Sequence, residues 1–180
     1  MEPQQVKGTG LIPVIAYIRN RFGDDGWAKV VESLPPHLRS ELAHKVMEIK
    51  WYPIELAAEM YAAVARLFAG GDPKLCQEIG RTSADYGLST VYKFFLRFGT
   101  PQMFGSRGPD MWKTYYTGSA LVVSVNDKGH IAVEVQGIQT SDAHFYSIIG
   151  WMERAGELTG GKNIRVVPDV PKRRVEVFYE

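Results

Sequence analysis

The hydrophobic positions of this chain change their spacing several times between residues 117 and 180. Leu121, Val123 and Val125 occupy alternate positions, and after the polar segment Asn-Asp-Lys-Gly at 126–129 the alternation resumes with Ile131, Val133 and Val135. A period of two is typical of a strand with one buried face, and a short polar segment ending in glycine is typical of a hairpin turn. The pattern therefore predicts a β-hairpin.

A helical pattern and two further strands follow the hairpin. Residues 141–158 carry apolar side chains at helical spacing, open with the capping residues Ser and Asp, and precede a Gly-Gly pair. Strand-like sequences return at 164–166 and at 175–179. Because an isolated hairpin is not stable in water, further elements must cover its apolar face. We therefore predict an α+β fold in which N-terminal helices pack on a four-stranded antiparallel sheet made of two hairpins flanking a helix.

Upstream of the first hairpin, apolar residues recur at helical spacing. Pro13, Pro53 and Pro73 lie where the first turns of helices are expected, and glycines follow several of the periodic runs. The predicted helices span residues 10–22, 24–34, 37–47, 53–69 and 73–98, with one more short helix around 111–116. Residues 1–8 are polar and are expected to be flexible. No internal repeat or linker divides the chain, which indicates one domain over residues 1–180.

Two glycines lie inside the longest predicted helix. Gly80 and Gly87 are seven residues apart and therefore fall on nearly the same face. Each costs roughly 1 kcal/mol relative to alanine in a helix, so their presence indicates that something approaches the backbone closely. A neighbouring helix or the sheet is the favoured interpretation, and a bound ligand is the alternative.

Composition excludes several classes of partner. The chain has 21 basic and 20 acidic side chains, so it produces no general field that would attract nucleic acid. Cys76 is the only cysteine and cannot form an internal disulfide. No apolar run approaches the ~18 residues of a membrane span, and no basic-then-apolar leader is present. A cytoplasmic location is expected.

The sequence contains no motif that specifies a reaction. The G-x-x-x-x-G-K pattern at 156–162 follows a predicted helix and precedes a strand, whereas a phosphate-binding loop has the opposite context, and Asn163 stands where magnesium binding needs Ser or Thr. The four histidines are scattered without metal-ligand spacing, and Cys76 is best interpreted as a small buried core residue. We expect no catalytic residue, no metal site and no cofactor.

Aromatic residues and one histidine are the candidates for ligand binding. His144 lies in the first turn of the helix at 142–158, where the helix dipole favours a neutral imidazole that can donate to a phenol or carbonyl. A solvated or backbone-bonded surface histidine is the alternative, and aromatic residues at helical spacing can equally be core. The candidate ligand-binding residues are Tyr86, Trp112, Tyr115, Tyr116, His144 and Trp151.

Several short segments carry a resemblance to known families. They are Val6-Lys7-Gly8, Ser33-Leu34-Pro35-Pro36, Trp51-Tyr52-Pro53, Gly70-Gly71-Asp72-Pro73, Glu78-Ile79-Gly80-Arg81 and Thr114-Tyr115-Tyr116. Together they span nearly the whole chain and are similar to a family of uncharacterised myxobacterial proteins of about this length. The order of elements, with Gly150 and Gly160-Gly161 bracketing the last helix and Val175-Glu176-Val177-Phe178-Tyr179 as the last strand, resembles the superfamily that includes vinyl-4-reductase type, haem–nitric-oxide-binding and Golgi-transport domains.

The superfamily resemblance implies a hydrophobic cavity between helices and a curved antiparallel sheet. Members use such a cavity to sense small aromatic or lipid-like molecules or to hold haem, or they use the fold as a pairing surface. This chain lacks the cysteine cluster of vinyl-4-reductase type sensors and the Y-x-S-x-R signature of haem–nitric-oxide domains, so neither zinc nor haem is expected.

These observations lead to two hypotheses about function. In the first, the chain is a non-enzymatic sensory or regulatory module that buries a small apolar or aromatic ligand in a helix–sheet cavity. In the alternative, it is a structural adaptor that forms a homodimer through a helix face and has no small ligand. An apolar cavity would favour the first hypothesis, and a collapsed core with a large exposed apolar patch would favour the second.

Overall fold

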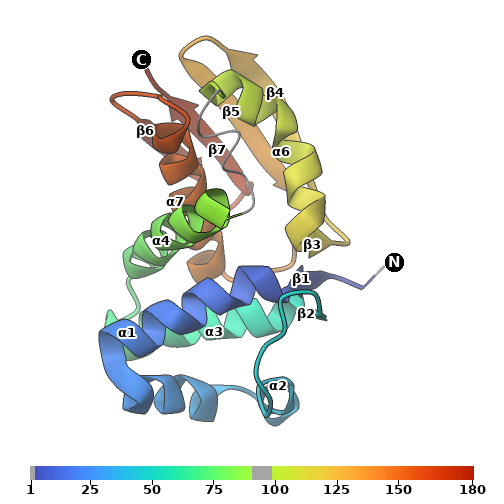
Figure 1. The fold of residues 1–180 in the computed structure, drawn as a ribbon, viewed down its shortest axis with the longest axis vertical. Coiled ribbons are helices and arrows are strands. Elements are labelled where there is room, and N and C mark those ends of the chain that lie inside the picture. The colour runs from blue at the N-terminus through green and yellow to red at the C-terminus, as the bar shows by residue number, and fades with distance from the viewer. Residues whose placement is uncertain (1–2, 91–98) are drawn as a thin grey trace.

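A computed structural model describes residues 3–90 and 99–180 (Figure 1). It contains helices and strands in mixed order along the chain. In sequence they are β1 (Gln5–Lys7), α1 (Gly8–Ser33), α2 (Pro36–Glu41), β2 (Trp51–Pro53), α3 (Ile54–Phe68), α4 (Lys74–Thr90), α6 (Pro101–Tyr115), β3 (Tyr116–Thr117), β4 (Ala120–Asp127), β5 (His130–Gln136), α7 (Asp142–Leu158), β6 (Arg165–Asp169) and β7 (Arg174–Phe178).

The larger sheet confirms the predicted α+β fold. Its strands are antiparallel in the order β4-β5-β7-β6, so two hairpins flank α7 in sequence and join through β5 and β7 in space. Val133 pairs with Val175, and Ile131 pairs with Val177. Directly paired residues share a face, so these valines and isoleucine form one apolar surface that packs against Phe145, Ile148 and Ile149 of α7.

A β-bulge corrects one detail of the first hairpin. The alternation of 121–125 predicts that Val125 shares a face with Leu121 and Val123. The register instead shifts between Val123 and Val125, so that Val125 pairs with Ala132 and Asn126 pairs with Ile131. A bulge inserts one residue and exchanges the faces beyond it. Asn126 therefore shares the inner face of the sheet, where its Nδ2 donates to the Gln102 carbonyl oxygen of α6.

A second, three-stranded sheet was not predicted. Its order is β2-β1-β3, and Val6 at its centre is almost completely buried. The segment before Gly8, expected to be flexible, thus contains β1. Strands of two or three residues are too short to show a period of two, so the sequence pattern gives no signal for them.

Four predicted helices differ from the observed ones. The predictions over 10–22 and 24–34 merge into α1 across a kink at Gly23, whose φ of 73° only glycine adopts easily. The helix predicted to reach residue 47 ends at Glu41, because the following turn brings the Met47 backbone N–H to the Tyr52 hydroxyl. The fourth helix, α6, is longer than predicted.

The sequence did not predict the full length of α6, because the helix contains two glycines and a proline. Gly105, Gly108 and Pro109 disfavour a helix locally, yet Pro101 opens a helix that runs through all three. The Thr100 side chain accepts a hydrogen bond from the Met103 backbone N–H and caps it. The helix predicted over 73–98 is observed as α4 up to Thr90, and its remaining part lies outside the described residues.

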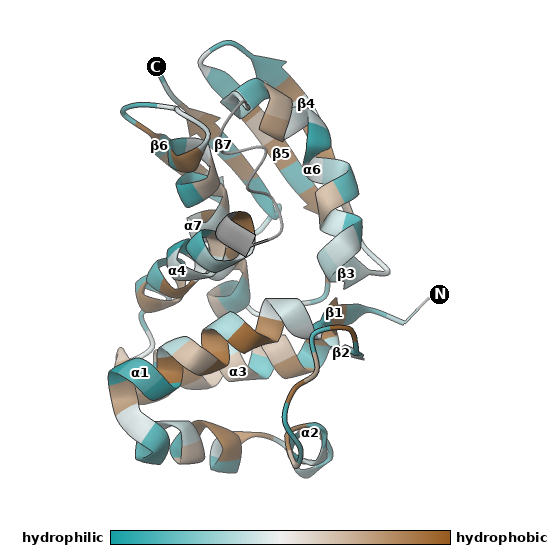
Figure 2. Cartoon of the chain, viewed as in Figure 1, coloured by the Kyte–Doolittle hydropathy of each residue, from teal (hydrophilic) through white to brown (hydrophobic). Residues whose placement is uncertain are grey.

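The molecule has an upper body around the larger sheet and a lower body built from α1, α2, α3 and the small sheet (Figure 1). One group of buried residues lies mainly in α1 and α3, and a second lies between α7 and the larger sheet. In Figure 2, strongly hydrophobic residues recur along α1, whereas α6 is mostly pale or hydrophilic. None of the helices in the described ranges has the length and hydrophobicity that crossing a membrane requires.

Helices α4 and α7 cross at very short range. A Cβ atom at Gly80 would lie 1.8 Å from the Ser147 carbonyl oxygen, and one at Gly150 would lie 2.0 Å from the Gln77 carbonyl oxygen. Arg81 of α4 forms ion pairs with Glu153 and Glu157 of α7 along the same contact. The predicted close approach at Gly80 is thus confirmed as a helix contact, and it makes α4 and α7 a single packed unit.

Candidate ligand-binding pocket

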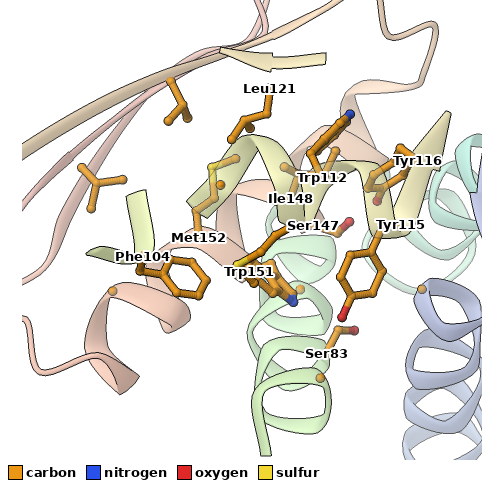
Figure 3. A pocket seen from close by; sticks show the side chains of 18 of the residues that line it. Ser83, Phe104, Trp112, Tyr115, Tyr116, Leu121, Ser147, Ile148, Trp151 and Met152 are labelled. Atoms are coloured by element: carbon orange, nitrogen blue, oxygen red, sulfur yellow. The ribbon is translucent and has the colours of Figure 1, made fainter. Parts of the chain in front are cut away.

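A pocket lies where α6, the α4–α7 unit and the inner face of the larger sheet meet (Figure 3). Its volume is about 140 Å³. An engineered apolar cavity of about 150 Å³ remains dry and binds benzene or xenon, so this pocket matches a ligand of roughly one aromatic ring. Leu121, Ile131, Val133 and Val177 form its sheet side.

Helix α6 supplies one whole wall of the pocket. Its lining residues recur three or four positions apart, which places them on one helix face. They are Phe104, Gly105, Gly108, Met111, Trp112 and Tyr115, together with Pro101 at the start of the helix. The two glycines let the helix approach the sheet, since a Cβ at Gly108 would lie 2.8 Å from Leu121 Cδ2. The inner face of α6 therefore packs on the sheet and borders the pocket at the same time.

The opposite wall comes from α4 and α7. Gly80, Ser83 and Gly87 of α4 line the pocket, as do Ser147, Ile148, Trp151, Met152 and Gly156 of α7. Gly87 differs from Gly80 because, among the described residues, no backbone of another element lies within 4 Å of its Cβ position. A Cβ there would lie 3.2 Å from the Tyr115 hydroxyl and 4.0 Å from Trp151 Nε1. The alternative interpretation of the two glycines was a bound ligand beside the helix. Gly87 borders the pocket, so this interpretation stays a prediction for Gly87.

Most polar groups around the pocket already have protein partners. The Ser147 hydroxyl donates to the His144 carbonyl oxygen and the Ser83 hydroxyl to the Ile79 carbonyl oxygen. Trp112 Nε1 donates to the Ser119 hydroxyl at 3.1 Å. Trp151 Nε1 makes no hydrogen bond within the described part of the chain. It lies beside the Tyr115 ring, and in Figure 3 these two side chains and Ser83 gather at one end of the pocket.

The pocket favours neutral groups. None of its described lining residues is Asp, Glu, Lys, Arg or His. Burial raises the pKa values of Tyr61 and Tyr116 well above their usual range, so both remain neutral phenols. An ionised ligand would lose its hydration there without gaining an opposite charge.

His144 lies behind the pocket and does not line it. It is 2% exposed, stacks on the Tyr61 ring at a centroid distance of 5.1 Å, and lies 3.2 Å through Nε2 from the Tyr116 hydroxyl. Its Nδ1 lies 2.6 Å from the Thr140 hydroxyl. Burial, with a smaller contribution from the Arg173 charge, lowers the pKa of His144 to about 3. The ring is neutral, as predicted, but burial rather than the helix dipole is the main cause, and the alternative of a surface histidine is wrong.

Four of the six candidate residues from the sequence converge on this pocket. Trp112, Tyr115, Tyr116 and Trp151 line it, whereas Tyr86 is 43% exposed and does not. His144 reaches it only through Tyr61 and Tyr116. Their role in ligand binding remains a prediction.

The candidate residues predicted from the sequence did not include Phe104 and Met111 of α6 or the sheet residues that line the pocket. The spacing of positions 104, 108, 111 and 115 along α6 was the available signal, and the glycine and proline in that run concealed it.

Two further groups of residues bear on the chemistry of the protein, the possible metal ligands and Cys76. No group of three or more His, Cys, Asp or Glu residues within them could hold a metal ion. Cys76 is completely buried, and its thiol lies 3.5 Å from the Tyr61 carbonyl oxygen. Burial raises the pKa of this thiol to about 12, which suppresses the thiolate form that acts as a nucleophile.

The structure is an α+β fold with an apolar pocket between helices and an antiparallel sheet, and comparison with solved structures identifies this fold. The chain has the fold of H-NOX domains. It superposes on an H-NOX protein from K. algicida with a TM-score of 0.73 and 10% identity, over 97% of this chain and 96% of that one. A mutant H-NOX from T. tengcongensis gives 0.65 and 17%, over 97% of both chains.

An oxygen-binding H-NOX domain related to soluble guanylate cyclases gives a TM-score of 0.60 and 16% identity, over 97% of this chain and 95% of that one. At such identities the likeness establishes the fold alone. No protein-family model matches the sequence, and no curated protein matches it either.

The described residues of the pocket do not fit haem. Haem needs an axial ligand such as His, Cys, Met or Tyr, and Met111 and the tyrosines could supply that donor type. Its two propionate carboxylates, however, would meet no positive charge among the described lining residues. A volume of about 140 Å³ is also well below the roughly 300–1,000 Å³ of pockets that hold larger ligands. The fold is that of H-NOX domains, but neither the volume nor the described lining of this pocket fits a haem group.

Proposed function

We propose that this protein is a non-enzymatic sensory module that buries a small apolar or aromatic molecule in the pocket between α6, the α4–α7 unit and the larger sheet. The observation that carries the proposal is the pocket of about 140 Å³, whose described lining residues are uncharged and mostly aromatic or aliphatic. Burying apolar surface contributes about 25 cal/mol per Å², which supplies the affinity without any reactive group.

The arrangement of the walls suggests how binding would produce a signal. Helix α6 packs on β4 and borders the pocket through one face, whereas α4 and α7 are bound to each other by glycine contacts and ion pairs. A ligand that contacts both walls stabilises one position of α6 relative to the α4–α7 unit. A ligand shifts such an equilibrium only by its difference in affinity for the two positions.

Thermal unfolding with toluene tests the proposal. At ten times its dissociation constant, a ligand that binds only the folded state stabilises it by about 1.4 kcal/mol, or roughly 3–6 °C in Tm for a domain of this size. We expect this rise for the wild type. We expect Gly87→Leu to abolish the rise, because leucine would project from α4 into the pocket.

Thr82→Leu is the matched control, because it adds leucine to an exposed position of the same helix. It should retain the full response to toluene. A wild type that does not respond at saturating toluene, or an equal response from Gly87→Leu, would contradict the proposal.

A further inference from the structure

The pocket contains an indole N–H, that of Trp151, with no acceptor among the described residues. An indole N–H can only donate, and Trp151 Nε1 has no acceptor within the described residues. It lies 4.0 Å from the Cβ position of Gly87, on the pocket side of α4. Trp151 is partly buried and borders the pocket, so its N–H is available to an acceptor on a ligand at this point.

The surroundings of this donor are polar but neutral. The Tyr115 hydroxyl lies 3.2 Å from the same Cβ position of Gly87. Ser83 lies one turn before Gly87 on α4, and its hydroxyl donates to the Ile79 carbonyl oxygen. The opposite side of the pocket consists of aliphatic side chains from the sheet, such as Leu121 and Val133. The end of the pocket near Gly87 is therefore polar but neutral, and the side formed by the sheet is apolar.

We propose that the ligand is a neutral, single-ring aromatic molecule that carries one acceptor oxygen, and that this oxygen accepts a hydrogen bond from Trp151 Nε1 while the ring packs against the sheet. This inference rests on the proposed function and adds the chemical class of the ligand. A carboxylate in place of the neutral oxygen binds poorly, because the described lining residues offer it no cation.

Calorimetric titration of two ligands of matched shape tests the inference. Acetophenone and isopropenylbenzene differ in having an oxygen atom or a CH₂ group at the same place. A net hydrogen bond of this kind corresponds to roughly threefold to tenfold tighter binding, so acetophenone should bind more tightly than isopropenylbenzene by about that factor. Benzoate should bind at least about a hundredfold more weakly than acetophenone.

Two tryptophan variants locate the source of the preference. Trp151→Phe keeps an aromatic ring and removes the N–H, so the ratio of the two affinities should fall to about one. Trp112→Phe is the matched control, since Trp112 also lines the pocket but its N–H is already bound to Ser119. Its ratio should equal that of the wild type. The wild-type ratio can be measured even if Trp151→Phe does not fold.

The outcomes separate the inference from the proposed function. If isopropenylbenzene binds but acetophenone has no advantage, or if Trp151→Phe keeps the advantage, the inference is wrong and the binding module remains. If neither compound binds at saturating concentration, the proposed function itself is wrong. A preference that only Trp151→Phe removes would support both.

Discussion

At the scale of single residues, burial decides the chemistry of the titratable groups near the pocket. His144 and Cys76 are types of residue that often act in catalysis, yet both are buried and have pKa values that favour their uncharged forms. Their partners are Tyr116 and Thr140 for the histidine and a backbone carbonyl for the thiol. Both side chains therefore contribute to packing, and neither lines the pocket.

His144 should make the fold sensitive to acid. Its pKa in the folded protein, about 3, lies below the usual value of 6.5, so between these values the unfolded chain binds the extra proton. The contribution to stability is complete above about pH 6.5 and is lost as the pH falls, by at most about 1.4 kcal/mol per pH unit. In urea unfolding at pH 7.5, 5.5 and 4.5, His144→Gln should be less stable at pH 7.5 but lose less stability on acidification. The exposed His37→Gln should follow the wild type, and parallel curves for all three proteins would refute the assignment.

Cys76 should be protected in the folded state. Because its thiol is buried and its pKa is raised to about 12, a thiol-reactive dye should label it only through unfolding. We expect less than about a hundredth of the labelling rate of the urea-unfolded chain, measured by absorbance under native conditions. Rapid native labelling would show that α4 does not pack on α3 as the structure has it.

At the scale of elements, two glycines of α4 have opposite roles although they look equivalent in sequence. Gly80 contacts the backbone of α7, and Gly87 faces the pocket. The same helix face thus provides a tight helix crossing at one end and space for a ligand at the other.

Alanine substitution should distinguish the two glycines. Gly80→Ala places a Cβ 1.8 Å from the Ser147 carbonyl oxygen and should destabilise the protein by about 2 kcal/mol or more, since the backbones must separate. Gly87→Ala places its Cβ 3.2 Å from the end of the Tyr115 side chain. It should be close to neutral, because alanine gains up to about 1 kcal/mol in helix propensity. Equal losses in the free energy of urea unfolding would contradict this distinction.

The local sequence predicts some helices and strands better than others. The hairpins and α7 could be predicted because their periods, turns and caps are encoded within a few residues. The course of α6 could not, because Gly105, Gly108 and Pro109 disfavour a helix locally. Packing of the α6 face on the sheet offsets that preference, and only a folded partner provides it.

At the scale of the whole molecule, the pocket favours the binding module over the adaptor. The exposed large apolar residues among those described are distributed over several elements, and they include Met47, Ile49, Leu67, Met103 and Val167. This distribution gives no reason to select one helix face as a dimer interface.

Native mass spectrometry should resolve the two alternatives directly. We expect a monomer, with any additional mass small enough for one aromatic molecule and lost on denaturation. A dimer without bound ligand, maintained on dilution to nanomolar concentration, would instead favour the structural adaptor. Measuring the wild type beside Gly87→Leu would show whether any added mass comes from the pocket.

The sequence by itself determined the α+β class, the two hairpins, most helices and the aromatic residues available to a pocket, because hydrophobic period, turns and caps are local properties. It did not show that the Trp151 N–H has no acceptor among the described residues while that of Trp112 is bound to Ser119, or that His144 is buried behind Tyr116. It also did not distinguish Gly80 from Gly87. Only the tertiary structure decided these, because each depends on which atoms of distant segments lie within a few ångströms of one another.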